Sequence, residues 1–251
     1  MDSIISKGLE KYTINNSEVD DLSCLKISSL LHLFIVSTEK HIADIDVLSN
    51  TLQEQNLYLG LSRVSLEIES FPKLGNDITI VSWFRSIDSV FVYRDFLVFG
   101  TNDMQKPLVK ATTAWTMLNI ESRRPQKNDI IEGIIPFLDS TCGLEELPTK
   151  VDALPCAWSH SSGVVTSNDL DTNGFASKSI CFEWIANIYS KEHYDEMTIK
   201  RVDVNFISDA VLGDTFKVNM ASKGSGVYLN NVVKDADQKE LVRTRIYWLK
   251  R

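Results

Sequence analysis

Hydrophobic and polar positions divide the chain into two stretches that predict the same kinds of element. In the first stretch, apolar residues recur at helical spacing at Leu30, Leu31, Phe34, Ile35 and Ile42. Alternating apolar and polar residues then predict strands, with turn residues between them, over 57–71, 78–84, 90–100 and 107–120. One helix followed by several long antiparallel strands predicts an α+β fold.

The segment 168–190 begins with polar, turn-forming residues and continues as an amphipathic helix. Asp169, Asp171, Asn173 and Gly174 are residue types typical of turns and helix caps. After Ser177, one face of the helix collects the apolar residues Ile180, Cys181, Trp184, Ile185 and Ile188. Because a helix N-terminus presents unpaired backbone N–H groups, the pattern predicts a donor site for a polarised carbonyl or an oxyanion near Asn173 and Gly174. The alternative is a capped core helix without chemistry.

Matching spacings in the two stretches indicate a tandem duplication. Gly75 follows Arg63 after 12 positions, and Gly213 follows Arg201 after 12. Likewise, Asp20 stands 10 positions before Leu30, and Asp171 stands 10 before Cys181. Repeated element order with repeated spacing predicts two copies of one module. We therefore expect a first domain over 1–124, a linker over 125–160 and a second domain over 161–251. The linker contains four prolines, and we expect it to lie over the surface with one short helical turn near Leu144.

Composition and charge narrow the classes of function. With 251 residues, of which 43% are hydrophobic, the chain can bury a core without disulfides. Its cysteines, Cys24, Cys142, Cys156 and Cys181, lack CxxC or metal-ligand spacing, which predicts reduced thiols, no metal and a cytoplasmic location. The sequence has neither an apolar run of about 18 residues nor the pattern of a signal peptide, so no membrane association is expected. A net charge of −8 argues against general nucleic-acid binding.

Several blocks of the sequence resemble the acyl-acyl-carrier-protein (acyl-ACP) thioesterase family. They are LGLSRVSLEIESFPKLGNDITIVSWF, VYRDFLVF, ATTAWTMLNIESRRP and NDLDTNGFASKSICFEW. The resemblance implies a tandem double hot-dog fold, in which each copy is a curved antiparallel sheet wrapped around a central helix. It also implies a hydrolase that releases free fatty acid from acyl-ACP with water alone and no cofactor. The partner is then an acyl carrier protein, and the enzyme is a monomer or a homodimer.

The resemblance assigns candidate catalytic residues and also shows a departure. The family pattern Asp-x-Asn-x-His is matched at Asp171 and Asn173, but Phe175 stands at the expected histidine position. Asp209 aligns with a downstream carboxylate of the family. The resulting roles are Asp171 or Asp209 as general base, Asn173 as the group that positions water or the carbonyl, and the N–H groups of Gly174 and Phe175 as oxyanion donors.

Two further sets of residues are candidates for substrate and partner recognition. The resemblance places apolar residues of the first helix, Leu31, Phe34 and Ile35, in the acyl pocket. An acidic carrier protein needs a local positive patch, and the densest basic cluster is Arg123, Arg124 and Lys127. The alternative for this cluster is a solvated charge run at the start of the linker.

Other readings of the same residues remain open. Asp171 can simply cap the helix, and Asp209 can be a solvated carboxylate at a strand end. Phe175 favours a non-catalytic acyl or acyl-ACP binding protein with a degenerate site. A hot-dog hydratase expects Asp-x-Asn-x-x-His, and Ala176 occupies its last position. His160 and His193 are the candidates to replace the missing histidine from elsewhere in the chain.

Overall fold

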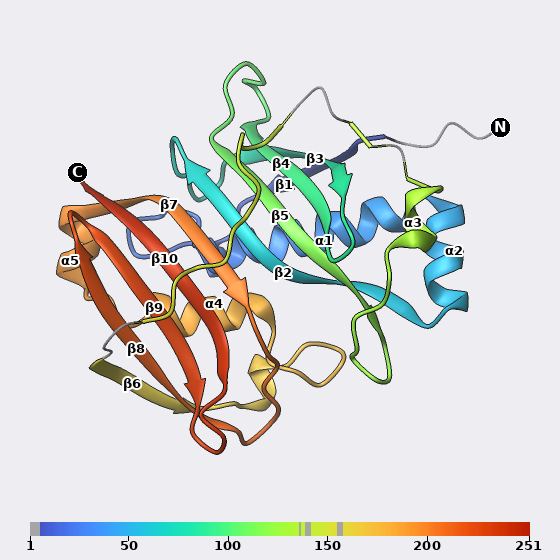
Figure 1. Cartoon of the computed structure of the whole chain (residues 1–251). Helices are drawn as coiled ribbons and strands as arrows, with labels where there is room; N and C mark the ends of the chain where they lie inside the picture. Colours follow the sequence, from blue (N-terminus) through green and yellow to red (C-terminus); the bar gives the residue numbers. More distant parts are fainter. Residues whose placement is uncertain (1–5, 136, 139–141, 155–157) are drawn as a thin grey trace. The chain divides into compact units, whose positions relative to one another are not determined.

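The computed structural model describes residues 6–135, 137–138, 142–154 and 158–251 (Figure 1). The chain forms two compact units, Met1–Pro148 and Thr149–Arg251. Within these described ranges, each unit contains one antiparallel sheet of five strands with a helix packed against it. The predicted α+β tandem double hot-dog fold is confirmed.

The first unit begins with a strand, a short 3₁₀ turn and the long helix, and continues with the strands of its sheet. Its elements are β1 (Gly8–Thr13), η1 (Asn16–Glu18), α1 (Ile27–Ala43), α2 (Asp46–Glu54), β2 (Leu57–Ile68), β3 (Asp77–Ile87), β4 (Val92–Gly100), β5 (Val109–Asn119) and α3 (Asp129–Glu132). The strands lie in the order β1-β3-β4-β5-β2, and neighbours are antiparallel.

The second unit repeats this plan. Its elements are β6 (Trp158–Val164), η2 (Ser167–Asp169), α4 (Lys178–Ala186), α5 (Lys191–Glu196), β7 (Met197–Phe206), β8 (Thr215–Gly224), β9 (Val227–Lys234) and β10 (Glu240–Lys250). The strand order β6-β8-β9-β10-β7 is that of the first unit, with each strand replaced by its counterpart. Gly75 and Gly213 occupy equivalent turns and both have positive φ, +76° and +84°. The duplication predicted from spacing therefore extends to topology and backbone conformation.

Helix α1 buries its apolar face against the sheet of the first unit. Leu31 and Phe34 have no exposed surface, and the Phe34 ring stacks on Phe96 of β4 with 4.4 Å between centroids. Burying one such side chain contributes about 2 kcal/mol. Helix α2, for which the sequence analysis gave no prediction, packs through Leu48 and Leu52, which are both buried and lie four residues apart.

The core of the second unit is built around the shorter helix α4. Phe182 and Ile185 are buried beneath β9 and β10, and the Trp184 ring stacks on Phe216 of β8 at 4.0 Å. Cys181 is buried on the same helix, and Cys24 is buried in the first unit, as expected for core cysteines. Cys142 is exposed, and Cys156 lies outside the described residues.

The described residues of the predicted linker 125–160 are packed, and the linker is divided between the units. Arg85 donates from Nη1 to the carbonyl of Leu144 at 2.6 Å and from Nη2 to that of Glu145 at 3.0 Å. The Leu144 N–H donates to Thr112 Oγ1 at 3.1 Å. Because side chains of the sheet bind its polar backbone groups, this stretch has no need of helical hydrogen bonds. The helical turn predicted near Leu144 was wrong; the short helix is α3, and β6 begins within the predicted linker.

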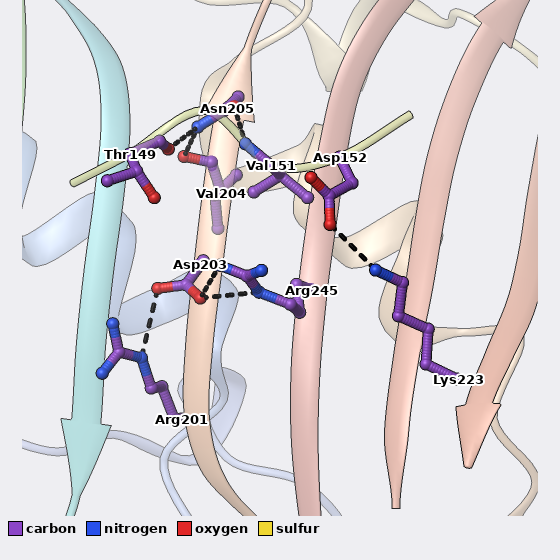
Figure 2. A network of polar contacts seen from close by, with 9 residues as sticks. All are labelled: Thr149, Val151, Asp152, Arg201, Asp203, Val204, Asn205, Lys223 and Arg245. Atoms are coloured by element: carbon purple, nitrogen blue, oxygen red, sulfur yellow. Dashed lines mark hydrogen bonds and ion pairs between the residues drawn. The ribbon is translucent and has the colours of Figure 1, made fainter. Parts of the chain in front are cut away.

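Residues 149–152, here called the strap, are held against the sheet of the second unit (Figure 2). Asn205 Oδ1 accepts a hydrogen bond from the Val151 N–H at 2.6 Å, and its Nδ2 donates to the Thr149 carbonyl at 3.1 Å. Lys223 pairs with Asp152 at 2.8 Å. On the same strands, Asp203 accepts from Arg201 at 3.3 Å and from Arg245 at 3.1 Å (Figure 2). The fully buried Val151 shows that the strap is part of the packed unit.

Candidate active site

The turn before α4 is organised by Asp171. Its Oδ1 accepts hydrogen bonds from the backbone N–H of Asn173 at 2.8 Å and of Phe175 at 3.2 Å. The Gly174 N–H donates to the Asp171 carbonyl at 3.0 Å, and Gly174 has φ +81°, a conformation that favours glycine. An aspartate that bonds its own loop in this way forms a local turn.

This geometry corrects the predicted position of the helix start. Helix α4 begins at Lys178, and its N-cap is Ser177, whose Oγ accepts from the Ile180 N–H at 3.3 Å. The N–H groups of Gly174 and Phe175 lie before the helix and already donate to Asp171. The oxyanion donors assigned to them as helix-start groups were therefore misplaced. The reason is local: the Asp and Asn side chains, which the sequence analysis took for helix caps, belong to a separate turn.

Backbone pairing brings this turn beside a distant part of the chain. Phe175 forms an isolated antiparallel bridge with Val211, and the Ala176 N–H donates to the Ala210 carbonyl at 2.9 Å. The pairing places residues 175–178 next to the loop after β7, which carries Asp209. Asp171 and Asn173 are exposed, whereas Phe175 and Asp209 are half-buried. The structure thus gathers the predicted residues of two separate segments at one end of α4.

Lys178 joins this group as a residue that the sequence analysis did not assign. Its Nζ lies 2.8 Å from Asp209 Oδ1, and it stands over the Phe206 ring at 5.4 Å from the centroid. The available signal was its position in the block NDLDTNGFASKSICFEW, directly after Ser177. A carboxylate and an ammonium with partial access to solvent can together handle a proton and stabilise developing negative charge.

Cys181, one turn further along α4, is a poor nucleophile. Burial raises the pKa of its thiol to about 12, and the nearby charges of Lys178 and Asp209 act on it in opposite directions. A thiol with so high a pKa stays protonated, and the thiolate is the reactive form. The chemistry that this arrangement supports is attack by water.

The two histidines that were candidates to replace the missing catalytic histidine, His160 and His193, lie in different surroundings. His160 is exposed on β6. His193, on α5, packs among aromatic rings, with its centroid 4.4 Å from that of Trp248 and 5.2 Å from that of Tyr189. Burial lowers the pKa of His193, which favours its neutral form.

The candidate pocket and docking residues belong to the first unit. Leu31 and Phe34 are fully buried in its core and Ile35 is half-buried. Arg124 and Lys127 are exposed, whereas the Arg123 guanidinium lies over the Tyr58 ring at 5.1 Å. The exposed part of the basic cluster is therefore Arg124 and Lys127.

Neither a metal cluster nor a membrane-crossing helix is found in the part of the chain that the structure describes. Across residues 6–135, 137–138, 142–154 and 158–251, no three His, Cys, Asp or Glu side chains are grouped to hold a metal ion. Within the same ranges, every helix is too short or too polar to cross a membrane.

Comparison with known proteins identifies relatives along the whole chain. Acyl-[acyl-carrier-protein] hydrolase FATB1 of Cuphea viscosissima is 22% identical over 265 residues, covering 98% of this chain and 63% of the relative. FATB3 of the same plant is 17% identical over 254 residues, covering 95% of this chain and 61% of the relative. The chain thus spans about three fifths of the length of these curated relatives.

Solved structures share the fold. An acyl-ACP thioesterase from Bacteroides thetaiotaomicron superposes with a TM-score of 0.86 at 20% identity, covering 97% of this chain and 98% of the other. The 12:0-ACP thioesterase from Umbellularia californica gives 0.85 at 17% identity, covering 100% and 99%. The family model described as acyl-ACP thioesterase N-terminal domain matches residues 7–134. Because this match spans more than half of the 251 residues, the protein belongs to the acyl-ACP thioesterase family.

Proposed function

We propose that the protein hydrolyses the thioester of a fatty acyl group carried on an acyl carrier protein and releases free fatty acid. Family membership gives the reaction class, and the named activity of the Cuphea relatives agrees with it. The observation that carries the proposal is the pairing of Phe175 and Ala176 with Val211 and Ala210, which places the Asp171 turn beside Asp209. These are the segments in which the family pattern has its polar residues.

In the proposed reaction, a water oxygen attacks the carbonyl carbon of the thioester. Asp209 accepts the proton of the water, and the exposed amide of Asn173 positions the water or the carbonyl. Asp171 holds the turn that presents Asn173. The C–S bond then breaks, and the sulfur of the carrier's prosthetic group takes up the proton. The acyl pocket at Leu31, Phe34 and Ile35 stays a prediction from the resemblance.

Phe175 lowers the expected rate of this reaction. A phenyl ring cannot transfer a proton, and a general acid or base group typically contributes about 10²- to 10⁴-fold in rate. The test is to incubate the purified protein with octanoyl- to stearoyl-ACP and to follow release of free thiol. We expect slow turnover by the natural protein and faster turnover by Phe175→His. Absence of thiol release from the natural protein, together with its appearance in Phe175→His, would refute the proposed hydrolase activity.

A second candidate function is binding of acyl-ACP without turnover. Phe175 favours it, because the side chain at the expected histidine position is apolar and half-buried. This alternative predicts that acyl-ACP binds with saturation and is recovered intact. A titration followed by mass spectrometry of the carrier separates binding from hydrolysis.

The carrier protein is proposed to dock on the basic residues Arg124 and Lys127. Both are exposed, and attraction between opposite charges speeds the encounter of two proteins. Replacing both with Gln should raise KM for acyl-ACP while leaving kcat unchanged, and raised salt should reduce the difference. Arg123→Gln serves as a comparison, because its guanidinium packs on Tyr58. The cytoplasmic location and the monomeric or dimeric state stay predictions from the sequence.

A further inference from the structure

The Lys178–Asp209 ion pair is not explained by the stability of helix α4. Lys178 is the first residue of this helix, where the positive end of the helix dipole disfavours a cation. The side chains of Lys178 and Asp209 retain 23% and 28% of their exposure, and an ion pair so open to solvent contributes little to stability. The contact therefore offsets an unfavourable placement and adds little to folding.

The first unit provides an internal control for this conclusion. Its bridge between Cys24 and Lys73 matches that between Phe175 and Val211. The bond from the Leu25 N–H to the Pro72 carbonyl, 2.8 Å, matches that from Ala176 to Ala210, 2.9 Å.

This register equates Lys178 with Ile27 and Asp209 with Phe71. Ile27 and Lys178 are each the first residue of their helix. The first unit therefore builds the same turn, bridge and helix start with two apolar residues, so the fold does not require charges at these positions.

We propose that Lys178 is a catalytic residue of thioester hydrolysis, acting as the positive partner of Asp209. The inference rests on the proposed function and deepens it. As water adds to the carbonyl carbon, electrons move from the C=O bond to its oxygen, which the Lys178 ammonium stabilises. An ammonium has three N–H donors, and one is directed to Asp209. Asp209 takes the water proton and returns it to the departing sulfur as the C–S bond breaks.

The position of Lys178 fits this role. It lies three residues beyond Phe175, on the segment that pairs with residues 210–211, so its charge lies at the same end of α4 as the Asp171 turn. The N–H groups of the first turn of α4 give this end of the helix a partial positive charge, which stabilises a negative charge placed there. In this chain a cation at the helix start supplies electrostatic stabilisation where the histidine of the family pattern is absent.

Three variants test the proposal with acyl-ACP hydrolysis and thermal unfolding as readouts. Lys178→Ile with Asp209→Phe installs the pair found in the first unit. We expect its melting temperature to stay close to that of the natural protein, its kcat to fall by about 10²-fold or more, and its KM to change by less than about threefold. Lys178→Arg keeps the positive charge and should retain kcat within about tenfold.

Exchanging the two residues, Lys178→Asp with Asp209→Lys, separates a catalytic role from a structural one. The exchanged pair can still form an ion pair, and a carboxylate suits the helix start, so stability should be kept. Turnover should be lost, because a negative charge now faces the developing oxyanion and the proposed base no longer stands at position 209. Natural kcat in the exchanged or the apolar variant would overturn the role of Lys178. If the apolar variant does not fold, the exchanged variant and Lys178→Arg decide.

The outcome also distinguishes this inference from the proposed function. A natural protein that releases no thiol refutes both. A natural protein that hydrolyses acyl-ACP, with double variants that do so equally well, refutes the roles of Lys178 and Asp209 but leaves the proposed hydrolase activity standing.

Discussion

Asp171 makes in the second unit the same turn that Asp20 makes in the first. Oδ1 of Asp20 accepts from two backbone N–H groups of its own loop, at 3.0 and 2.8 Å, two and four residues further on. Oδ1 of Asp171 does the same at 2.8 and 3.2 Å, with the same two spacings. The family pattern assigns a catalytic role only to Asp171. Comparing variants of Asp20 and Asp171 therefore separates the effect of losing the turn on stability from the effect on catalysis.

The first prediction compares Asp20→Ala with Asp171→Ala. Both changes remove two hydrogen bonds in an equivalent loop, and each should lower the free energy of unfolding by about 1 kcal/mol. Only Asp171→Ala should also lower kcat, because only its turn presents Asn173. Urea denaturation and thiol release provide the two measurements. An equal loss of kcat in Asp20→Ala would show that the effect comes from general destabilisation.

The second prediction concerns the packed segment around Leu144. A Cβ added at Gly143 would lie inside van der Waals contact of the Ala111 carbonyl oxygen on β5. Overpacking of this kind costs about 1–3 kcal/mol, so Gly143→Ala should lower the midpoint of urea denaturation. Gly133→Ala is the matched control, because nothing lies within 4 Å of its added Cβ. Equal midpoints for the two variants would contradict tight packing of this segment.

The third prediction concerns Arg94, which is fully buried on β4. Its Nη2 donates to Ser82 Oγ at 2.9 Å and lies 3.0 Å from His41 Nδ1, but among the described residues Nε and Nη1 have no hydrogen-bond partner. Burial lowers the pKa of Arg94 to about 9. Arg94→Met should therefore raise the free energy of unfolding by about 1–4 kcal/mol at neutral pH, because a buried charge that is only partly compensated is removed.

The pH dependence of this effect has a definite sign. The folded-state pKa of Arg94 lies below the unfolded value, so the penalty is complete below about pH 9 and shrinks as Arg94 loses its proton at higher pH. The advantage of Arg94→Met should shrink in the same range. Arg85→Met is the control, because Arg85 donates to two carbonyl groups and its loss should be destabilising. A destabilised Arg94→Met would show that the bonds of Nη2 outweigh the burial penalty.

The fourth prediction is that His193 makes the protein less stable in mild acid. Burial lowers the folded-state pKa of His193 below the ordinary value of 6.5. The unfolded chain therefore takes up the proton first, and stability is lost as the pH falls through about 6.5 towards the folded-state pKa. Melting temperatures at about pH 8 and about pH 5 should differ less in His193→Phe than in the natural protein, with His160→Phe as a control for the added ring. An unchanged difference would contradict the role of His193.

The elements that the sequence analysis found are those with a regular apolar period. Helix α1 and strands β2 to β5 contain many buried apolar residues, and these residues mark the elements in the sequence. Strand β6 was missed because six of its seven residues are exposed, so no alternation marks it. Helix α2 was missed although Leu48 and Leu52 carried its signal, because the polar residues between them dominate the stretch.

The Asp171 turn could be predicted from the sequence, because its hydrogen bonds join residues two and four positions apart and depend on local residue types. The Lys178–Asp209 contact could not be predicted in this way, because it joins side chains 31 positions apart. Which side chains meet there depends on the register of residues 175–176 against 210–211. That register is set by how the whole sheet and helix pack, and a shift of one residue would turn a different side chain towards Lys178.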